Sequence, residues 1–311
     1  MPQRVPEPAI VIAGPTASGK SRVAMALAER LDGVIINADS MQVYRELAVL
    51  TARPTRAEAA RLPHALYGFV SGAEAYSAGR FAADAQAAIA EARSNGRRPM
   101  IVGGTGLYFH ALLTGLSPVP AADPQVRAHW RQEAGRRPSQ ELHATLAARD
   151  PVMAERLSPT DPQRIVRALE VLETTGRSLA DWQRQPGRPV PGLADARRLL
   201  LLPEPSSHGA AIGQRFEAML AAGALGEVTA LHALGLSNEL PIMRALGVAP
   251  LLAHVRGAID LDAAATAAKL ETRQYAKRQM TWFRRNMIAW KPIKMQEMER
   301  SLREILAFIE P

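Results

Sequence analysis

The chain has 311 residues, a formal net charge of +8 and no cysteine. The absence of cysteine excludes disulfides, thiolate nucleophiles and cysteine-ligated zinc, and no apolar run reaches the ~18 residues of a membrane span or the ~7–15 of a secretory signal. We therefore expect a cytoplasmic protein that binds no membrane and has no evident obligate protein partner. Its positive charge favours a polyanionic ligand.

An apolar run at residues 9–13 predicts a buried strand, and residues 14–21 directly after it read GPTASGKS. This octapeptide fits the P-loop pattern G-x-x-x-x-G-K-[ST], and residues 21–31 then place apolar side chains on one face of a predicted helix. In a P-loop, backbone N–H groups and the positive helix end point at a phosphate. The lysine neutralises phosphate charge, and the hydroxyl of the last residue, here Ser21, holds Mg²⁺. The predicted phosphate-binding residues are Gly14, Pro15, Thr16, Ala17, Ser18, Gly19, Lys20 and Ser21.

Further strands and helices alternate along the first third of the chain. Strands are predicted at residues 34–37 and 100–102, and helices at 55–62, 81–93 and 107–113. This alternation predicts an α/β fold with a P-loop NTPase-like parallel sheet flanked by helices. Ligands of such sheets bind at the carboxyl ends of the strands. The P-loop, Asp39 and Thr105 all follow predicted strands, so we expect their three loops to converge.

The composition and the predicted secondary structure of the chain change after residue 118. Residues 123–184 are rich in arginine and read as helices, residues 198–202 predict a strand that rejoins the sheet, and the chain from residue 212 onward reads as helical again. We therefore predict a catalytic core made of residues 1–118 and 196–311, with an all-helical lobe inserted at 119–195.

Two polar residues after predicted strands carry more than one interpretation. Asp39 can hold Mg²⁺ or act as a general base beside a phosphate, or it can be an ordinary turn or cap residue. Thr105 follows two glycines that let a ligand approach the backbone, and its hydroxyl can face the ligand, cap a helix, or do both. Position alone does not separate these alternatives. His64 lies in a predicted loop and is assigned no role.

A predicted helix near the C-terminus is strongly basic. Lys269, Arg273 and Lys277 recur every four residues and therefore share a face. Three more arginines and four aromatic residues are interleaved with them, namely Arg278, Arg284, Arg285, Tyr275, Trp282, Phe283 and Trp290. Cationic side chains with aromatic neighbours suit a nucleic-acid backbone and its stacked bases. The alternative is a solvated surface helix.

Taken together, these motifs resemble those of the bacterial tRNA dimethylallyltransferases. The matching segments run in order along nearly the whole chain: GPTASGKS, ADSMQVYR from residue 38, YSAGRFAADA from 76, VGGTGLYF from 102, DPQRIVRALEV from 161, RFEAML from 215 and TRQYAKRQMTWFRR from 272. The pairing of GPTASGKS with DSMQVY is highly specific.

The resemblance implies a reaction and its site. A dimethylallyl group would pass from dimethylallyl diphosphate to N6 of the adenosine at position 37, next to the anticodon, in tRNAs reading codons that begin with U. It implies Asp39 as the base, Thr105 as a positioning group and Arg215 as a diphosphate ligand. It also implies that the inserted lobe grips the anticodon stem–loop. The residues expected to contact tRNA, including three from the basic helix, are Asp39, Ser40, Met41, Gln42, Thr105, Arg127, Gln163, Arg164, Ile165, Val166, Arg167, Lys277, Arg278 and Arg284.

The chain departs from the family pattern in places, and other functions compete. Leu50, Ala211 and Val248 stand where the family more often has glycine, arginine and tyrosine, and Ala65 replaces a histidine beside His64. The rival functions are an adenylate dimethylallyltransferase, a nucleotide or small-molecule kinase, and a non-enzymatic RNA-binding P-loop protein. The basic helix favours tRNA over a free nucleotide.

Overall fold

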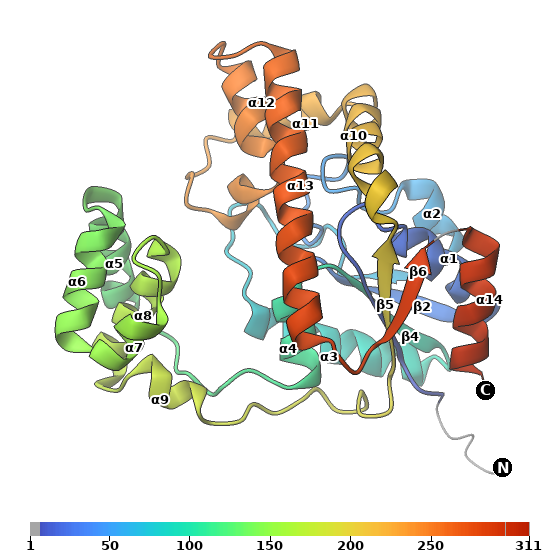
Figure 1. Ribbon diagram of the computed structural model, residues 1–311, viewed down its shortest axis with the longest axis horizontal. Helices are drawn as coiled ribbons and strands as arrows, with labels where there is room; N and C mark the ends of the chain where they lie inside the picture. Colours follow the sequence, from blue (N-terminus) through green and yellow to red (C-terminus); the bar gives the residue numbers. More distant parts are fainter. Residues whose placement is uncertain (1–6, 296, 311) are drawn as a thin grey trace. The chain divides into compact units, whose positions relative to one another are not determined.

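The computed structural model describes residues 7–295 and 297–310. The chain divides into two compact units (Figure 1). The first comprises Met1–Leu113 and Val190–Pro311, and the second comprises Thr114–Pro189. The boundaries predicted from the sequence between the core and the inserted lobe lie at residues 118/119 and 195/196.

The first unit is built on one six-stranded sheet in which every neighbouring pair is parallel, in the order β3-β2-β4-β1-β5-β6. The fold class predicted from the alternation of strands and helices is confirmed. The strands are β1 (Ile10–Ala13), β2 (Gly33–Ala38), β3 (His64–Ala65), β4 (Arg98–Gly103), β5 (Arg197–Pro203) and β6 (Lys291–Met295).

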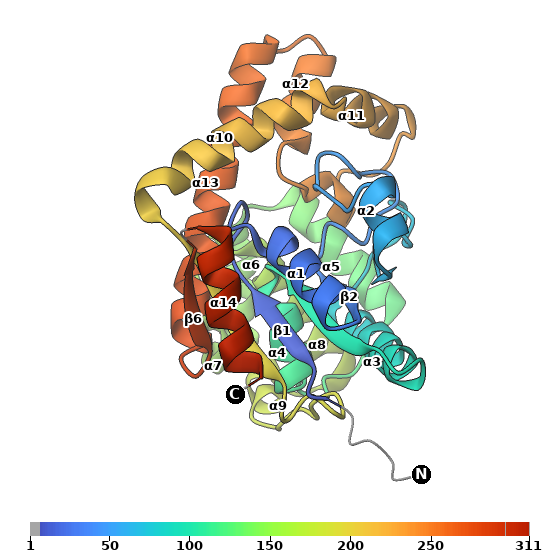
Figure 2. The ribbon, with the colours of Figure 1, turned by 90° about the vertical axis from the view of Figure 1, so that its right-hand side faces the viewer.

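Helices cover both faces of this sheet because its central strands are apolar on both sides. In β1, Ile10 and Ile12 pack with α1 (Lys20–Arg30) and α14 (Met298–Ile309), which lie side by side in Figure 2. Val11 packs toward the opposite face. The other helices of this unit are α2 (Arg56–Arg61), α3 (Ala78–Ser94), α4 (Gly106–Leu113), α10 (Pro205–Ala221), α11 (Ala224–Ala233), η1 (Pro241–Arg244), α12 (Val248–Val255) and α13 (Leu261–Asn286).

Two strands and one helix start were not predicted. His64 belongs to β3 and not to a loop, and α10 begins at Pro205, before residue 212. The prediction of helix from residue 212 onward is wrong at Lys291–Met295, which forms the edge strand β6 beside β5. Pro292 makes that segment look unlike a strand. Proline is nevertheless tolerated on an edge strand, because an N–H that would point to solvent can be absent without the loss of a hydrogen bond between strands.

The second unit is helical, as the sequence predicts for its central part. Its helices are α5 (Pro124–Arg136), α6 (Ser139–Arg149), α7 (Pro151–Arg156), α8 (Pro162–Thr175) and α9 (Leu179–Gln183). They enclose their own core around Trp130, Leu142 and Ile165. Asp123 and Asp161 cap α5 and α8 by accepting hydrogen bonds from backbone N–H groups of the first turn.

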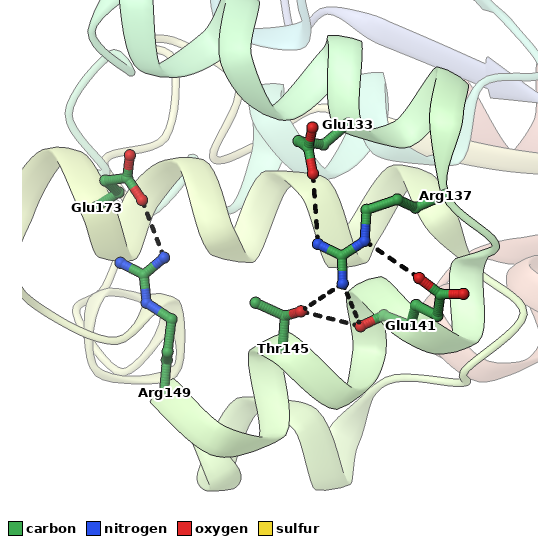
Figure 3. Close-up of polar contacts among 6 residues, drawn as sticks. All are labelled: Glu133, Arg137, Glu141, Thr145, Arg149 and Glu173. Carbon is green, nitrogen blue, oxygen red and sulfur yellow. Dashed lines mark hydrogen bonds and ion pairs between the residues drawn. The ribbon is translucent and has the colours of Figure 1, made fainter.

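Some arginines of this unit are used internally (Figure 3). Arg137 pairs with Glu133 and Glu141 and donates to Thr145, and Arg149 pairs with Glu173 at 2.9 Å. These pairs tie α5, α6 and α8 to one another. The arginine content of the unit therefore overstates the positive charge it can offer to a ligand.

No helix within residues 7–295 and 297–310 is both long enough and apolar enough to cross a membrane.

Candidate active site

Three loops meet at the carboxyl ends of β1, β2 and β4. In the sheet register, Gly103 lies beside both Ala13 and Ala38. The N–H of Gly14 donates to the carbonyl of Gly103 at 3.3 Å, and the N–H of Thr105 donates to the carbonyl of Ala38 at 3.2 Å. The predicted convergence of the P-loop with the loops of Asp39 and Thr105 is confirmed.

The P-loop is a tight turn that leads into α1. Gly19 has φ +81°, a left-handed conformation that favours glycine. A Cβ on Gly14 would lie 2.6 Å from Oγ of Ser18, so the loop closes on itself only with glycine there. The first N–H groups of a helix have no partner within the helix. Those of α1, which begins at Lys20, point toward the place where the sequence predicts a phosphate.

Lys20 and Arg215 bring positive charge to this loop. The Lys20 ammonium donates to the carbonyl of Pro15 at 3.2 Å, and Arg215 of α10 donates to Oγ1 of Thr16 at 3.5 Å. Burial lowers the pKa of Lys20 from 10.5 to about 8; the charge of Arg215 acts in the same direction and Asp39 opposes it. Burial also lowers the pKa of Arg215, again opposed by Asp39. The loop thus has two desolvated cations beside it, and a bound anion would stabilise their charge.

The lowered pKa of Lys20 predicts a pH-dependent affinity for a diphosphate. A bound anion raises the pKa of the ammonium, so binding is strongest while Lys20 is protonated and weakens as pH rises through about 8. Above that value we expect affinity to fall toward tenfold per pH unit. Calorimetric titration with dimethylallyl diphosphate at a series of pH values measures this.

Lys20→Arg is the matched control for that titration, because a guanidinium stays charged throughout the range. The ligand's own ionisation affects both proteins alike, so the ratio of their affinities isolates Lys20. A ratio that does not change between about pH 7 and pH 9.5 would contradict the assignment.

Asp39 is held by its own loop and by Thr105. Its Oδ1 accepts from the N–H of Met41 at 2.9 Å, and its N–H donates to Oδ1 of buried Asn37 at 2.8 Å. Oγ1 of Thr105 accepts from the N–H of Ser40 at 3.0 Å. Thr105 therefore contacts the residues on both sides of Asp39. Its hydroxyl thus helps to hold the Asp39 loop in place, a contact that its sequence context did not predict.

The Asp39 carboxylate also acts on three tyrosines. Burial, with a contribution from Asp39, raises the pKa of Tyr67, Tyr108 and Tyr275. The Thr105 side chain acts on the pKa of Tyr275 in the opposite direction. These hydroxyls stay protonated, and the charge of Asp39 influences them as it influences Lys20 and Arg215. None of these tyrosines was predicted to lie near Asp39; of the three, Tyr275 alone was singled out, as an aromatic residue of the basic helix.

Two further residues were missed although they contact the P-loop directly. Gln279 of α13 accepts from the N–H of Thr16 at 2.9 Å, and Nε2 of His208 in α10 lies 2.8 Å from the Thr16 carbonyl. Thr16 was predicted to bind phosphate, yet its N–H here donates to Gln279. Gln279 lay inside a matched motif, but only the basic and aromatic residues of that motif were assigned a role. No sequence pattern marked His208.

The residues expected to contact tRNA fall in both units. Met41 and Gln42 belong to the Asp39 loop, and Nε2 of Gln42 donates to the carbonyl of Thr51 at 2.8 Å. In the second unit, Gln163 and Arg164 are exposed in the first turn of α8, and Arg127 is half-buried on α5.

The next three residues of α8 are less exposed than Gln163 and Arg164. The side chains of Ile165 and Val166 are buried in the core of the second unit. Arg167 lies near Glu170 and the carbonyl of Pro120. Ile165 and Val166 can therefore support a tRNA contact only by holding their exposed neighbours in place.

The basic segment forms one helix, α13, as predicted, but its two faces differ. Lys277, Arg278 and Arg284 are exposed. Lys269 pairs with Glu217 of α10, which reduces the charge of its face. The expected stacking role is wrong for Phe283 and Trp290, because both are buried in the core of the first unit.

The donor groups present suit Mg²⁺ only together with a ligand. The described part of the chain contains no cluster of three or more His, Cys, Asp or Glu side chains. Mg²⁺ commonly uses one or two protein oxygens together with waters and substrate phosphates. The exposed hydroxyl of Ser21 at the start of α1, beside a bound diphosphate, fits that pattern.

Comparison with known proteins extends these findings. Residues 42–286 match the family described as IPP transferase, and residues 8–66 match the isopentenyl transferase family. A protein of Parvibaculum lavamentivorans named tRNA dimethylallyltransferase is 50% identical over 97% of this chain and 96% of its own length.

Solved structures agree with the sequence comparison. The tRNA isopentenylpyrophosphate transferase of Bacillus halodurans is 31% identical, with a TM-score of 0.70 over 97% of this chain and 95% of its own. A eukaryotic dimethylallyltransferase acting on tRNA is 26% identical, with a TM-score of 0.78 over 94% of this chain and 75% of its own.

Proposed function

Because this chain belongs to the IPP transferase family, with relatives named tRNA dimethylallyltransferase, we propose that it transfers a dimethylallyl group to N6 of adenosine 37. The donor is dimethylallyl diphosphate, and the acceptors are tRNAs that read codons beginning with U. One observation supports this proposal most directly. The P-loop and the Asp39 loop lie on either side of the loop after β4, and Thr105 of that loop hydrogen-bonds the neighbours of Asp39. A cytoplasmic location, where tRNA is found, is part of the same proposal.

The proposed reaction exchanges one bond for another. A bond forms between N6 of adenine and C1 of the dimethylallyl group, while the bond from C1 to the diphosphate oxygen breaks. The bonding pair leaves with diphosphate, and the proton of N6 passes to the Asp39 carboxylate. An exocyclic amine of adenine is a weak nucleophile, so a base within reach of its proton accelerates the attack.

Negative charge develops on the leaving diphosphate, so the site needs positive charge beside it. The N–H groups at the start of α1, together with Lys20 and Arg215, stabilise the charge that develops on diphosphate, and a guanidinium suits this anion because its N–H fork can bind two oxygens. Both cations lie at the P-loop. Mg²⁺, held by Ser21 and the diphosphate, would add further neutralisation.

The acceptor must expose its base. An adenine stacked beside the anticodon cannot reach a group held in the P-loop, so it is extruded toward Asp39. Contacts to the tRNA backbone position the stem–loop. We assign them to Arg127, to the exposed start of α8 and to the basic face of α13. The remaining residues of the Asp39 loop, Ser40 to Gln42, lie beside the extruded base.

One incubation tests this proposal. Purified protein is mixed with unmodified tRNA, labelled dimethylallyl diphosphate and Mg²⁺, and the tRNA is digested to nucleosides. We expect label in N6-dimethylallyladenosine, and a parallel ribonuclease digest to oligonucleotides should place that label at position 37 alone. Label in free adenylate with none in tRNA would support the adenylate enzyme, and transfer of phosphate from ATP would support a kinase.

Removing charge from α13 should weaken tRNA binding without regard to sequence. For Lys277→Gln with Arg278→Gln, we expect lower affinity for all tRNAs. The slope of log affinity against log salt should be smaller by about 1 for each phosphate that the variant no longer neutralises. Both side chains are exposed, so folding should be unaffected. Filter binding at several salt concentrations measures the slope.

The matched control removes the same charge elsewhere. Arg300 and Arg303 are exposed on α14, and changing both to Gln lowers net charge equally. If that control flattens the salt dependence as much as the α13 variant does, the effect comes from net charge and α13 is not a backbone contact.

A further inference from the structure

The long helix α13 contributes one face to the active site. Tyr275, Gln279 and Trp282 are spaced by four and three residues, so they lie on the same side of the helix. All three contact the loop that follows β4. Tyr275 lies close enough to the Thr105 side chain to affect the pKa of its hydroxyl, Gln279 donates to the carbonyl of Gly104 at 2.8 Å, and a Cβ on Gly106 would lie 2.5 Å from the Trp282 ring. In Figure 1 this end of α13 runs beside α4.

Gln279 is the member of this face that also reaches the P-loop. Its side chain is 6% exposed, and both ends of its amide are used. Oε1 accepts from the N–H of Thr16, and Nε2 donates to the carbonyl of Gly104. The opposite orientation of the amide would set oxygen against oxygen and N–H against N–H, so the two partners fix it.

From Gly104 the contacts continue to Asp39. Gly104 precedes Thr105, whose N–H donates to the carbonyl of Ala38 and whose Oγ1 accepts from the N–H of Ser40. Asp39 lies between those two residues. A chain of hydrogen bonds thus runs from the diphosphate loop through Gln279 to the loop of the base. A Cβ on Gly104 would lie 2.4 Å from Nε2 of Gln279, so glycine permits this approach.

The P-loop end of this chain is held from several sides. Besides Gln279 at its N–H, Thr16 has His208 at its carbonyl and Arg215 at its hydroxyl. With those contacts Thr16 has little freedom to move relative to α10 and α13. The diphosphate is therefore placed by a loop whose position is set from outside the P-loop motif.

We propose that Gln279 is a positioning residue for the transfer reaction, because it fixes the spacing between the diphosphate loop and the Asp39 loop. The inference rests on the proposed function, which puts the donor on one loop and the acceptor on the other. Misplacement of reacting groups by about 1 Å can cost about 100-fold in rate. Loss of the link should therefore slow the chemical step more than it weakens either substrate.

The first test replaces Gln279 by Met, which has similar length and no amide. The control is Gln86→Met, the same change at an exposed position of α3 in the same unit. For Gln279→Met we expect the single-turnover rate of transfer to fall about 100-fold. The Kd for tRNA should stay within about threefold and that for diphosphate within about tenfold, because Lys20, Arg215 and the exposed cations remain. The control should match the wild type.

The second test approaches the same link from Gly104. Gly104→Ala pushes against Nε2 of Gln279, so we expect it to slow transfer about tenfold in the wild type. In a Gln279→Ala background that atom is gone, and the same change should cost less than about threefold. Such non-additivity is expected of residues that act through one contact. Gly104→Ala also serves as the test if Gln279→Met does not fold.

The outcomes separate the two proposals. If the wild type transfers no label to tRNA, the proposed function fails. If the wild type is active and Gln279→Met transfers as fast as Gln86→Met, the inference about Gln279 fails. A lower unfolding temperature of Gln279→Met with an unchanged rate per folded molecule would show a role in stability alone. The proposal would also be overturned if Gly104→Ala slowed transfer by the same factor in the wild type and in the Gln279→Ala background.

Discussion

Asp39→Asn should abolish most dimethylallyl transfer while leaving tRNA binding intact. General bases contribute about 10²–10⁴-fold to rate, and asparagine cannot take the N6 proton. Its side-chain oxygen can still accept the N–H of Met41, the contact that Asp39 makes at 2.9 Å. The loop that carries Ser40 to Gln42 should therefore keep its shape. Single-turnover transfer with saturating tRNA and donor measures the rate, and filter binding measures the Kd for tRNA.

The control for this variant is Asp195→Asn, an exposed aspartate just before β5 in the same unit. It removes the same charge away from the three loops. If Asp39→Asn transfers within about threefold of the wild type, Asp39 is not the base. If it loses tRNA binding and transfer together, its role lies in the acceptor complex and not in proton transfer.

Lys20→Ala should weaken binding of dimethylallyl diphosphate by about 2–5 kcal/mol, the usual cost of removing one partner of a buried, hydrogen-bonded charge pair. That corresponds to a loss of roughly 30-fold to several thousandfold. Affinity for tRNA should not change. Calorimetric titration of the donor, in the presence of Mg²⁺, measures the effect.

The same variant should fold at least as well as the wild type. Burial lowers the pKa of Lys20 to about 8, which means that below that pH the folded state carries a charge it disfavours relative to the unfolded chain. Removing the ammonium relieves that cost, which would itself fade as pH rises from about 8 toward 10.5. Arg30→Ala, at the exposed far end of α1, is the matched control. A loss of ATP binding with donor binding unchanged would favour a kinase.

Much of this protein could be predicted from local pattern. GPTASGKS lies between an apolar run and an amphipathic segment, and Gly19 does adopt the left-handed conformation that the loop requires. Asp39 and Thr105 each follow a strand, so a parallel sheet necessarily brings them to one edge. β6 escaped prediction because this five-residue edge strand beside β5 contains Pro292 and two lysines, which leave it few apolar residues.

The sequence by itself determined the P-loop motif, the alternation of strands and helices that makes the parallel sheet, and the loops of Asp39 and Thr105, because each pattern involves residues close together in the chain. Only the tertiary structure decided that Gln279 and His208 contact Thr16, that the charge of Asp39 acts on three buried tyrosines, and that Phe283 and Trp290 belong to the core. The physical reason is separation along the chain. Thr16 and Gln279 are 263 residues apart, and no periodicity of charge or hydropathy reports which distant side chain will accept one backbone N–H.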